Sequence, residues 1–76
     1  KDIVFDTNTL FYNSNTKSLE INTNKINAKS LQIYNIRGQL VMNVKDASKT
    51  SSVDVSSLTS GVYFVRSKSK YLKFLK

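Results

Sequence analysis

Residues 31–44, LQIYNIRGQLVMNV, decide the fold because they contain two strand-like segments joined by a recognisable turn. On both sides of the turn apolar and polar residues alternate, which is the period-two pattern of β-strands. Asn35 stands at the first corner of the turn. Gly38 stands at the fourth, where a type I turn followed by a left-handed residue favours glycine. The stretch therefore predicts a β-hairpin in which Asn35 and Gly38 have structural roles.

Five further segments have the same period-two pattern, and clusters of Ser, Thr and Asn separate them. They cover residues 9–13, 18–22, 52–56, 61–67 and 70–75. No window of the chain has the spacing of an amphipathic helix with a cap at its start. We therefore predict an all-β protein, an antiparallel β-sandwich of about seven short strands.

Apolar residues two positions apart in a strand are expected to share one face, which in a sandwich is the core face. The sets predicted to do so are Leu19 and Ile21, Leu31 and Ile33, Leu40, Met42 and Val44, Val53 and Val55, Val62 and Phe64, and Leu72 and Phe74.

A second informative stretch is SVDVSSLTSGVYFVRS, residues 52–67. We expect one strand to end here, a turn to carry Leu58 into the core, and Gly61 to open the next strand. Tyr63 has the spacing of the tyrosine corner of Greek-key sandwiches, in which the hydroxyl bonds back to the preceding corner. The alternative, that Tyr63 is simply a core aromatic, stays open. Asp54 is expected to point outward and accept hydrogen bonds from turn N–H groups rather than to act in catalysis.

The final stretch, residues 61–76, is expected to form the last hairpin and to place the end of the chain in a strand. It contains no acidic residue, and it supplies a large part of the chain's net charge of +7. Its cations are Arg66, Lys68, Lys70, Lys73 and Lys76. This asymmetry favours an anionic partner. A solvated lysine face that discourages edge-to-edge aggregation is the simpler interpretation of the same pattern.

Composition excludes most catalytic chemistry. The chain has no Cys and no His, so the common zinc, haem and iron–sulfur ligand sets cannot be built. Two glycines cannot make a phosphate-binding loop. The acids are scattered, with no pair spaced for general acid and base work: Asp2, Asp6, Glu20, Asp46 and Asp54. We expect no enzyme activity, no cofactor, no metal and no small-molecule substrate.

The 76 residues suffice for a single domain, residues 1–76, in which residues 1–9 form a linker or a first edge strand. The chain begins with Lys1 and shows neither a signal peptide nor an apolar run long enough to cross a bilayer. We therefore expect it to be excised from a longer protein. Exposed edge strands would also allow a homodimer or a swapped pair.

Two motifs and the terminal strand KYLKFLK together resemble the type A C-terminal sorting domain of the type IX secretion system of Bacteroidota. In that family a run of the form lxIYDxxGrxV precedes iDlSxLxxGvYfv, and the chain ends in a lysine-bearing strand. The first motif is matched by Ile33, Tyr34, Asn35, Gly38 and Val41. The second is matched by Asp54, Ser56, Leu58, Gly61, Val62, Tyr63 and Phe64. The resemblance extends from about residue 10 to residue 76.

The chain departs from the family pattern at three places. Asn35 replaces the commoner aspartate, and Gln39 replaces a commoner basic residue. The family's YPNP stretch is YNSN at residues 12–15, so the entry to the second strand is expected to differ.

The resemblance implies an immunoglobulin-like sandwich that acts as a sorting signal. The passenger protein would cross the periplasm, and the folded domain would direct it through the outer-membrane type IX translocon to the cell surface or the medium. Shuttle proteins and a surface sortase would be its partners, and the sortase commonly removes the domain. Such a domain is an address that a receptor reads, not an anchor. The residues expected to contact the machinery are Arg66, Lys70, Tyr71, Lys73, Phe74 and Lys76.

Two other functions stay open on the sequence. One is a structural or carbohydrate-binding immunoglobulin-like module that is retained on a secreted protein. The other is a basic nucleic-acid-binding β domain, because aromatic and basic residues alternate in the last hairpin. Against nucleic acid, Phe64 and Phe74 are predicted to lie on the core face, and no RNP-like run is present. We therefore expect no nucleic-acid partner.

Overall fold

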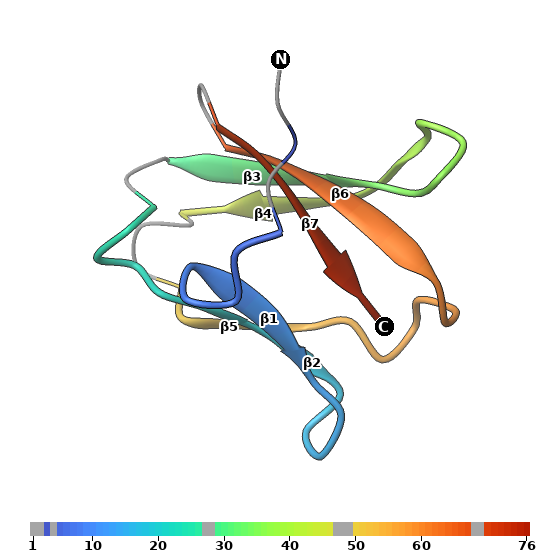
Figure 1. Ribbon diagram of the computed structural model, residues 1–76, viewed down its shortest axis with the longest axis horizontal. Coiled ribbons are helices and arrows are strands. Elements are labelled where there is room, and N and C mark those ends of the chain that lie inside the picture. The colour runs from blue at the N-terminus through green and yellow to red at the C-terminus, as the bar shows by residue number, and fades with distance from the viewer. Residues whose placement is uncertain (1–2, 4, 27–28, 47–49, 68–69) are drawn as a thin grey trace.

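The computed structural model describes residues 3, 5–26, 29–46, 50–67 and 70–76, and within these ranges it contains seven strands and no helix. The strands are β1 (Leu10–Asn13), β2 (Ser18–Ile21), β3 (Ser30–Tyr34), β4 (Leu40–Lys45), β5 (Ser52–Asp54), β6 (Val62–Ser67) and β7 (Lys70–Leu75). They form two antiparallel sheets that face each other (Figure 1). The predicted all-β sandwich of about seven short strands is confirmed. No helix in the described ranges is long and apolar enough to cross a membrane.

The order of the strands is that of an immunoglobulin-like Greek key. One sheet has the order β1-β2-β5 and the other has the order β4-β3-β6-β7. These correspond to strands A, B and E facing strands C′, C, F and G of the immunoglobulin arrangement. The chain changes sheets after β2, β4 and β5, and it ends on β7, an edge strand of the larger sheet.

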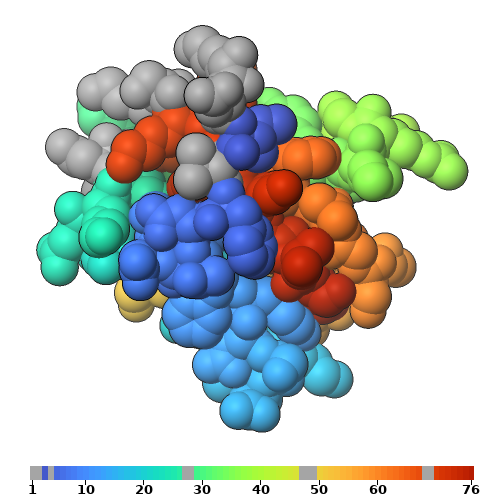
Figure 2. Space-filling view, viewed as in Figure 1, coloured from blue at the N-terminus to red at the C-terminus, as the bar shows by residue number. Residues whose placement is uncertain are grey.

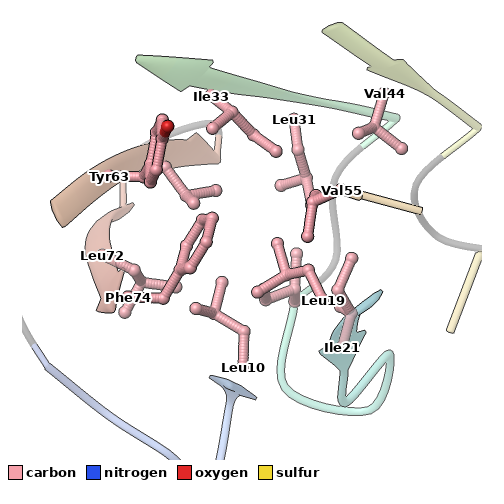
Figure 3. Close-up of a cluster of buried hydrophobic side chains, with 12 residues drawn as sticks. Leu10, Leu19, Ile21, Leu31, Ile33, Val44, Val55, Tyr63, Leu72 and Phe74 are labelled. Atoms are coloured by element: carbon pink, nitrogen blue, oxygen red, sulfur yellow. The ribbon is translucent and has the colours of Figure 1, made fainter. Parts of the chain in front are cut away.

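The core lies between the two sheets, and every strand contributes side chains to it (Figure 3). Alternate residues of β2, β3 and β7 face it, as the period-two pattern predicts: Leu19 and Ile21, Leu31 and Ile33, and Leu72 and Phe74 are all buried. Leu58 is half-buried and packs against this cluster, as predicted.

The β3–β4 hairpin has the turn that NIRG predicts. The Gly38 N–H donates to the Asn35 carbonyl at 2.9 Å, and Gly38 has a φ of +82°. The Asn35 side-chain oxygen accepts from the N–H groups of Arg37 and Gln39, at 2.9 and 3.0 Å. Asn35 and Gly38 therefore fix the turn, one through side-chain hydrogen bonds and the other through its conformational freedom.

Two predictions of which residues face the core are wrong. In β6 it is Tyr63 and Val65 that enter the core, whereas Val62 and Phe64 are half-exposed on the outer face. In β4 a register shift between Ile33 and Tyr34 places Leu40 opposite Tyr34, and Leu40 is 55% exposed. A bulge changes which side chains face the core, so a strict period of two does not continue through it.

Candidate functional site

The turn between β5 and β6 is a tyrosine corner. The Tyr63 hydroxyl donates to the Thr59 carbonyl at 2.7 Å, which is the bond that the corner prediction requires. The Leu58 N–H donates to the Val55 carbonyl at 3.0 Å and closes the turn. Gly61 follows with a φ of +152°, a conformation that residues with a Cβ rarely adopt. The corner fixes the start of β6 and thereby the whole last hairpin.

Tyr63→Phe is expected to lower the free energy of unfolding by about 1 kcal/mol, because it leaves the Thr59 carbonyl without this donor while keeping the ring in the core. Urea denaturation measures the loss. Tyr34→Phe, at a tyrosine on the outer face, is the matched control and should stay within about 0.5 kcal/mol of wild type. Equal stability of Tyr63→Phe and wild type would show that the corner bond contributes nothing.

Two carboxylates, those of Asp6 and Asp54, are held by turns. The Asp54 carboxylate accepts from the Ser56 N–H at 2.9 Å, as predicted, and this bond, the Ser56 side chain and the Lys76 charge lower the Asp54 pKa. The Asp6 carboxylate accepts from the Thr9 hydroxyl at 2.7 Å and the Asn8 N–H at 3.0 Å, and these bonds lower the Asp6 pKa. Both carboxylates therefore stabilise turns of the fold.

These lowered pKa values predict a loss of stability in acid. A carboxyl group with a lower pKa in the folded state stabilises the fold above its ordinary pKa of 3.8, and this contribution disappears as the pH falls through the folded value. The urea midpoint should therefore be constant near neutral pH and decrease below about pH 4. In the Asp6→Asn/Asp54→Asn variant the decrease should be shallower. Parallel decreases in the variant and the wild type would mean that groups other than Asp6 and Asp54 cause the acid sensitivity.

The last hairpin, β6–β7, brings most of the predicted contact residues together. The register pairs Arg66 with Tyr71 and Phe64 with Lys73. Because Leu72 and Phe74 face the core, Tyr71 and Lys73 point to the outer side of the sheet. Arg66 and Lys70 are exposed, and Tyr71 and Lys73 are half-buried. The hairpin therefore presents cations on its outer face. Lys68 lies outside the described residues.

Lys70, Phe74 and Lys76 alternate with Tyr71 and Lys73, so they do not share the outward direction of those two residues and Arg66. Phe74 is 1% exposed, and its ring stacks on Tyr63 with 5.4 Å between the ring centroids (Figure 3). Its side chain is therefore inaccessible to a partner in the folded domain, and only its backbone remains for contact. The reason is the alternation along β7, in which Leu72 and Phe74 fill the core while Tyr71 and Lys73 face outward.

Lys76 binds back onto the domain. Its ammonium donates to the carbonyls of Val55, at 2.8 Å, Ser56, at 3.3 Å, and Leu58. It also lies over the Tyr12 ring, 5.8 Å from the centroid. The Lys76 backbone exchanges two hydrogen bonds with Gly61, at 2.9 and 3.0 Å. Lys76 thus joins β7, the β5–β6 turn and β1, so a charge reversal at Lys76 is expected to destabilise the fold.

A groove of about 360 Å³ lies where β1 and the segment before it approach β7. Figure 2 shows these parts side by side on one face, in blue and red. The groove is lined by Phe5, Thr7, Phe11, Tyr12, Phe74 and Leu75. This lining offers no acid, base or activated nucleophile. Across the described ranges, no three His, Cys, Asp or Glu residues cluster as metal ligands would.

The sequence reasoning missed the outer-face position of Phe64, although a signal for it was present. Residues 62–65 are all apolar or aromatic, so the pattern alone fits either face. A tyrosine corner, however, turns Tyr63 inward, and then Val65 shares the core face and Phe64 cannot. The corner prediction and the Phe64 prediction were therefore incompatible.

Comparison with known proteins identifies the chain. The model of a family described as the secretion system C-terminal sorting domain matches residues 9–76, which include all seven strands. No curated protein and no solved structure matches the chain significantly. Since the match covers nearly the whole chain, including both motifs and the terminal strand, the protein belongs to the family of secretion system C-terminal sorting domains and is a sorting signal of type IX secretion.

Proposed function

We propose that residues 1–76 form the sorting domain of a longer exported protein of a member of the Bacteroidota, with residues 1–9 as a linker or first edge strand. The family is one of sorting signals rather than enzymes, and its signal implies transit to the cell surface or secretion. On our proposal the folded domain is read in the periplasm, directs its passenger through the outer-membrane translocon, and is then removed by a surface sortase. The match of the family over residues 9–76 is the observation that carries this function.

We propose that the machinery reads the cationic last hairpin, through Arg66, Tyr71 and Lys73 on its outer side and through the exposed Lys70 at its end. β7 is an edge strand, so a receptor can reach both its side chains and its outer backbone edge. The Lys70 ammonium donates to the Lys25 carbonyl at 3.2 Å, so one end of this surface is held in place. Phe74 and Lys76 support the surface from inside, through the core and the β5–β6 turn.

Export of a reporter tests this surface. A periplasmic reporter fused to the domain is expressed in a type IX-competent strain, and its amount outside the cell is measured. Arg66→Glu and Lys73→Glu should each reduce export, because they reverse charge on the proposed surface. Arg37→Glu is the control, since Arg37 is also exposed but lies in the β3–β4 turn.

Thermal melting of the purified variants is the check on folding, and all three changes should leave the midpoint nearly unchanged because they are surface substitutions. If Arg66→Glu and Lys73→Glu were exported as well as Arg37→Glu, the hairpin surface would not be what the machinery reads.

The homodimer through edge strands stays a prediction. β7 and β4 are the edges of the larger sheet, and β1 and β5 are the edges of the smaller one. Light scattering of the purified domain at two concentrations tests it. A mass of one chain at both concentrations would contradict a dimer.

A further inference from the structure

The outer face of the four-stranded sheet has two rows of side chains that cross its strands. One row is Leu40, Tyr34, Phe64 and Lys73, and the other is Asn43, Gln32, Arg66 and Tyr71. We call the two rows the outer platform. Except at Leu40, which pairs with Tyr34 across the bulge, neighbours along each strand face the core, so the platform residues lie on the opposite side of the sheet.

The outer platform combines aromatic and cationic groups. Tyr34 and Phe64 are cross-strand partners on the two central strands β3 and β6, and each is half-exposed. Arg66 and Lys73 stand beside Phe64, one along its strand and one opposite it on β7. Tyrosine, phenylalanine and arginine are the residues enriched in protein interfaces and their hot spots.

The charge of the outer platform has one sign. Among the described acids, Glu20 and Asp54 lie on the outer side of the other sheet, since their neighbours Leu19 and Val55 are buried. Asp6 lies before β1, and Asp46 follows the end of β4. No described carboxylate therefore stands in either row, and a partner that meets them must supply the negative charge.

The apolar residues around the rows indicate which class of partner fits. Leu40 is 55% exposed and Leu75, opposite Val62 on the same outer side, is 57% exposed. Aliphatic side chains add buried apolar area against a protein but give a nucleic base no stacking surface. The two rows contain two cations among the described residues, Arg66 and Lys73, and Lys45 lies on the same side of the sheet at the end of β4. Three cations are few for following a polyanion backbone.

We infer that the outer platform is a docking surface for an acidic protein segment that carries aromatic or aliphatic side chains at its centre. Phe64 and Tyr34 would contact the apolar centre, and Arg66 and Lys73 would pair with the acidic groups. The inference deepens the proposed function, because it names the chemistry of the protein that reads the sorting signal.

A titration of the isotope-labelled chain, followed by NMR, tests the partner class. The probes are a glutamate–tyrosine random copolymer, polyglutamate, oligo-dT, and phosphatidylcholine vesicles that contain phosphatidylglycerol. The copolymer should shift the amide signals of Tyr34, Phe64, Arg66 and Lys73 and should bind more tightly than polyglutamate. Equal binding of polyglutamate, tighter binding of oligo-dT or of the vesicles, or shifts confined to other surfaces would each overturn the inference.

Two variants locate the binding. Phe64→Thr should weaken copolymer binding about tenfold. Phe11→Thr should leave it unchanged, since Phe11 is an exposed aromatic on the other sheet. If Phe64→Thr has lost its dispersed NMR spectrum, Arg66→Glu takes its place with the same expectation. Equal affinities of the Phe11 variant and the folded platform variant would contradict the inference.

The two proposals fail in different ways. If a reporter fused to the unaltered domain is not exported, the proposed function fails. The titration alone then decides whether the outer platform is a docking surface. If the reporter is exported but Phe64→Thr is exported as well as Phe11→Thr and the copolymer shows no preference for the platform, the docking inference fails and the sorting function stands.

Discussion

Phe74→Ala is expected to lower the free energy of unfolding by about 3–5 kcal/mol, the usual cost of removing a buried aromatic ring. Phe74 is 1% exposed, and its ring stacks on Tyr63 in the centre of the core. A domain of 76 residues lies near the low end of the stability range for folded proteins, about 5 kcal/mol. The variant should therefore be largely unfolded at room temperature, with loss of near-UV circular dichroism.

The next residue along the chain supplies the control. Leu75 is 57% exposed and belongs to the same strand, so Leu75→Ala should change stability by no more than about 0.5 kcal/mol. If both variants had the same stability, Phe74 would not be a core residue, and the assignment of β7's faces would be wrong.

Lys76→Ala is expected to lower the free energy of unfolding by about 2 kcal/mol. The substitution removes a charged donor from the carbonyls of Val55, Ser56 and Leu58, and hydrogen bonds to charged groups are the stronger ones. The carbonyls of Val55 and Leu58 are in part-buried surroundings, so water replaces the ammonium only in part. Urea denaturation measures the loss.

Amide hydrogen exchange shows which part of the fold is destabilised by Lys76→Ala. The Leu58 N–H is bonded to Val55 and the Gly61 N–H to Lys76, so both amides should exchange faster in Lys76→Ala. Lys73→Ala is the control, because Lys73 lies on the outer face of the same strand and should leave both amides protected. Unchanged exchange at Leu58 in Lys76→Ala would mean that the ammonium does not hold the turn.

The fold follows from the sequence where local chemistry is decisive. The Asn35–Gly38 turn and the Tyr63 corner each depend on a few neighbouring residues, and both are found as predicted. The seven strands follow from period-two patterns bounded by turn-forming residues. These features are local, so the order of residues specifies them without knowledge of the partner strand.

The candidate site was predictable only in part, because it depends on contacts between distant residues. Alternation places Arg66 and Lys73 on the outer side, and it places Lys76, two positions beyond the buried Phe74, on the inner side. The carbonyls that accept from its ammonium lie about 20 positions earlier in the chain, and no pattern within the last strand encodes these partners. Leu40 faces outward for a similar reason, since the bulge arises from its pairing with β3.

The most direct test of the sorting function is the export of a reporter fused to residues 1–76 in two strains, one with an intact type IX translocon and one without it. The reporter is first directed to the periplasm in both strains, and its extracellular amount is compared. We expect it outside the cell only when the translocon is present, and in the periplasm when the translocon is absent. Equal extracellular amounts in the two strains, or retention in both, would contradict the assignment of this domain as a type IX sorting signal.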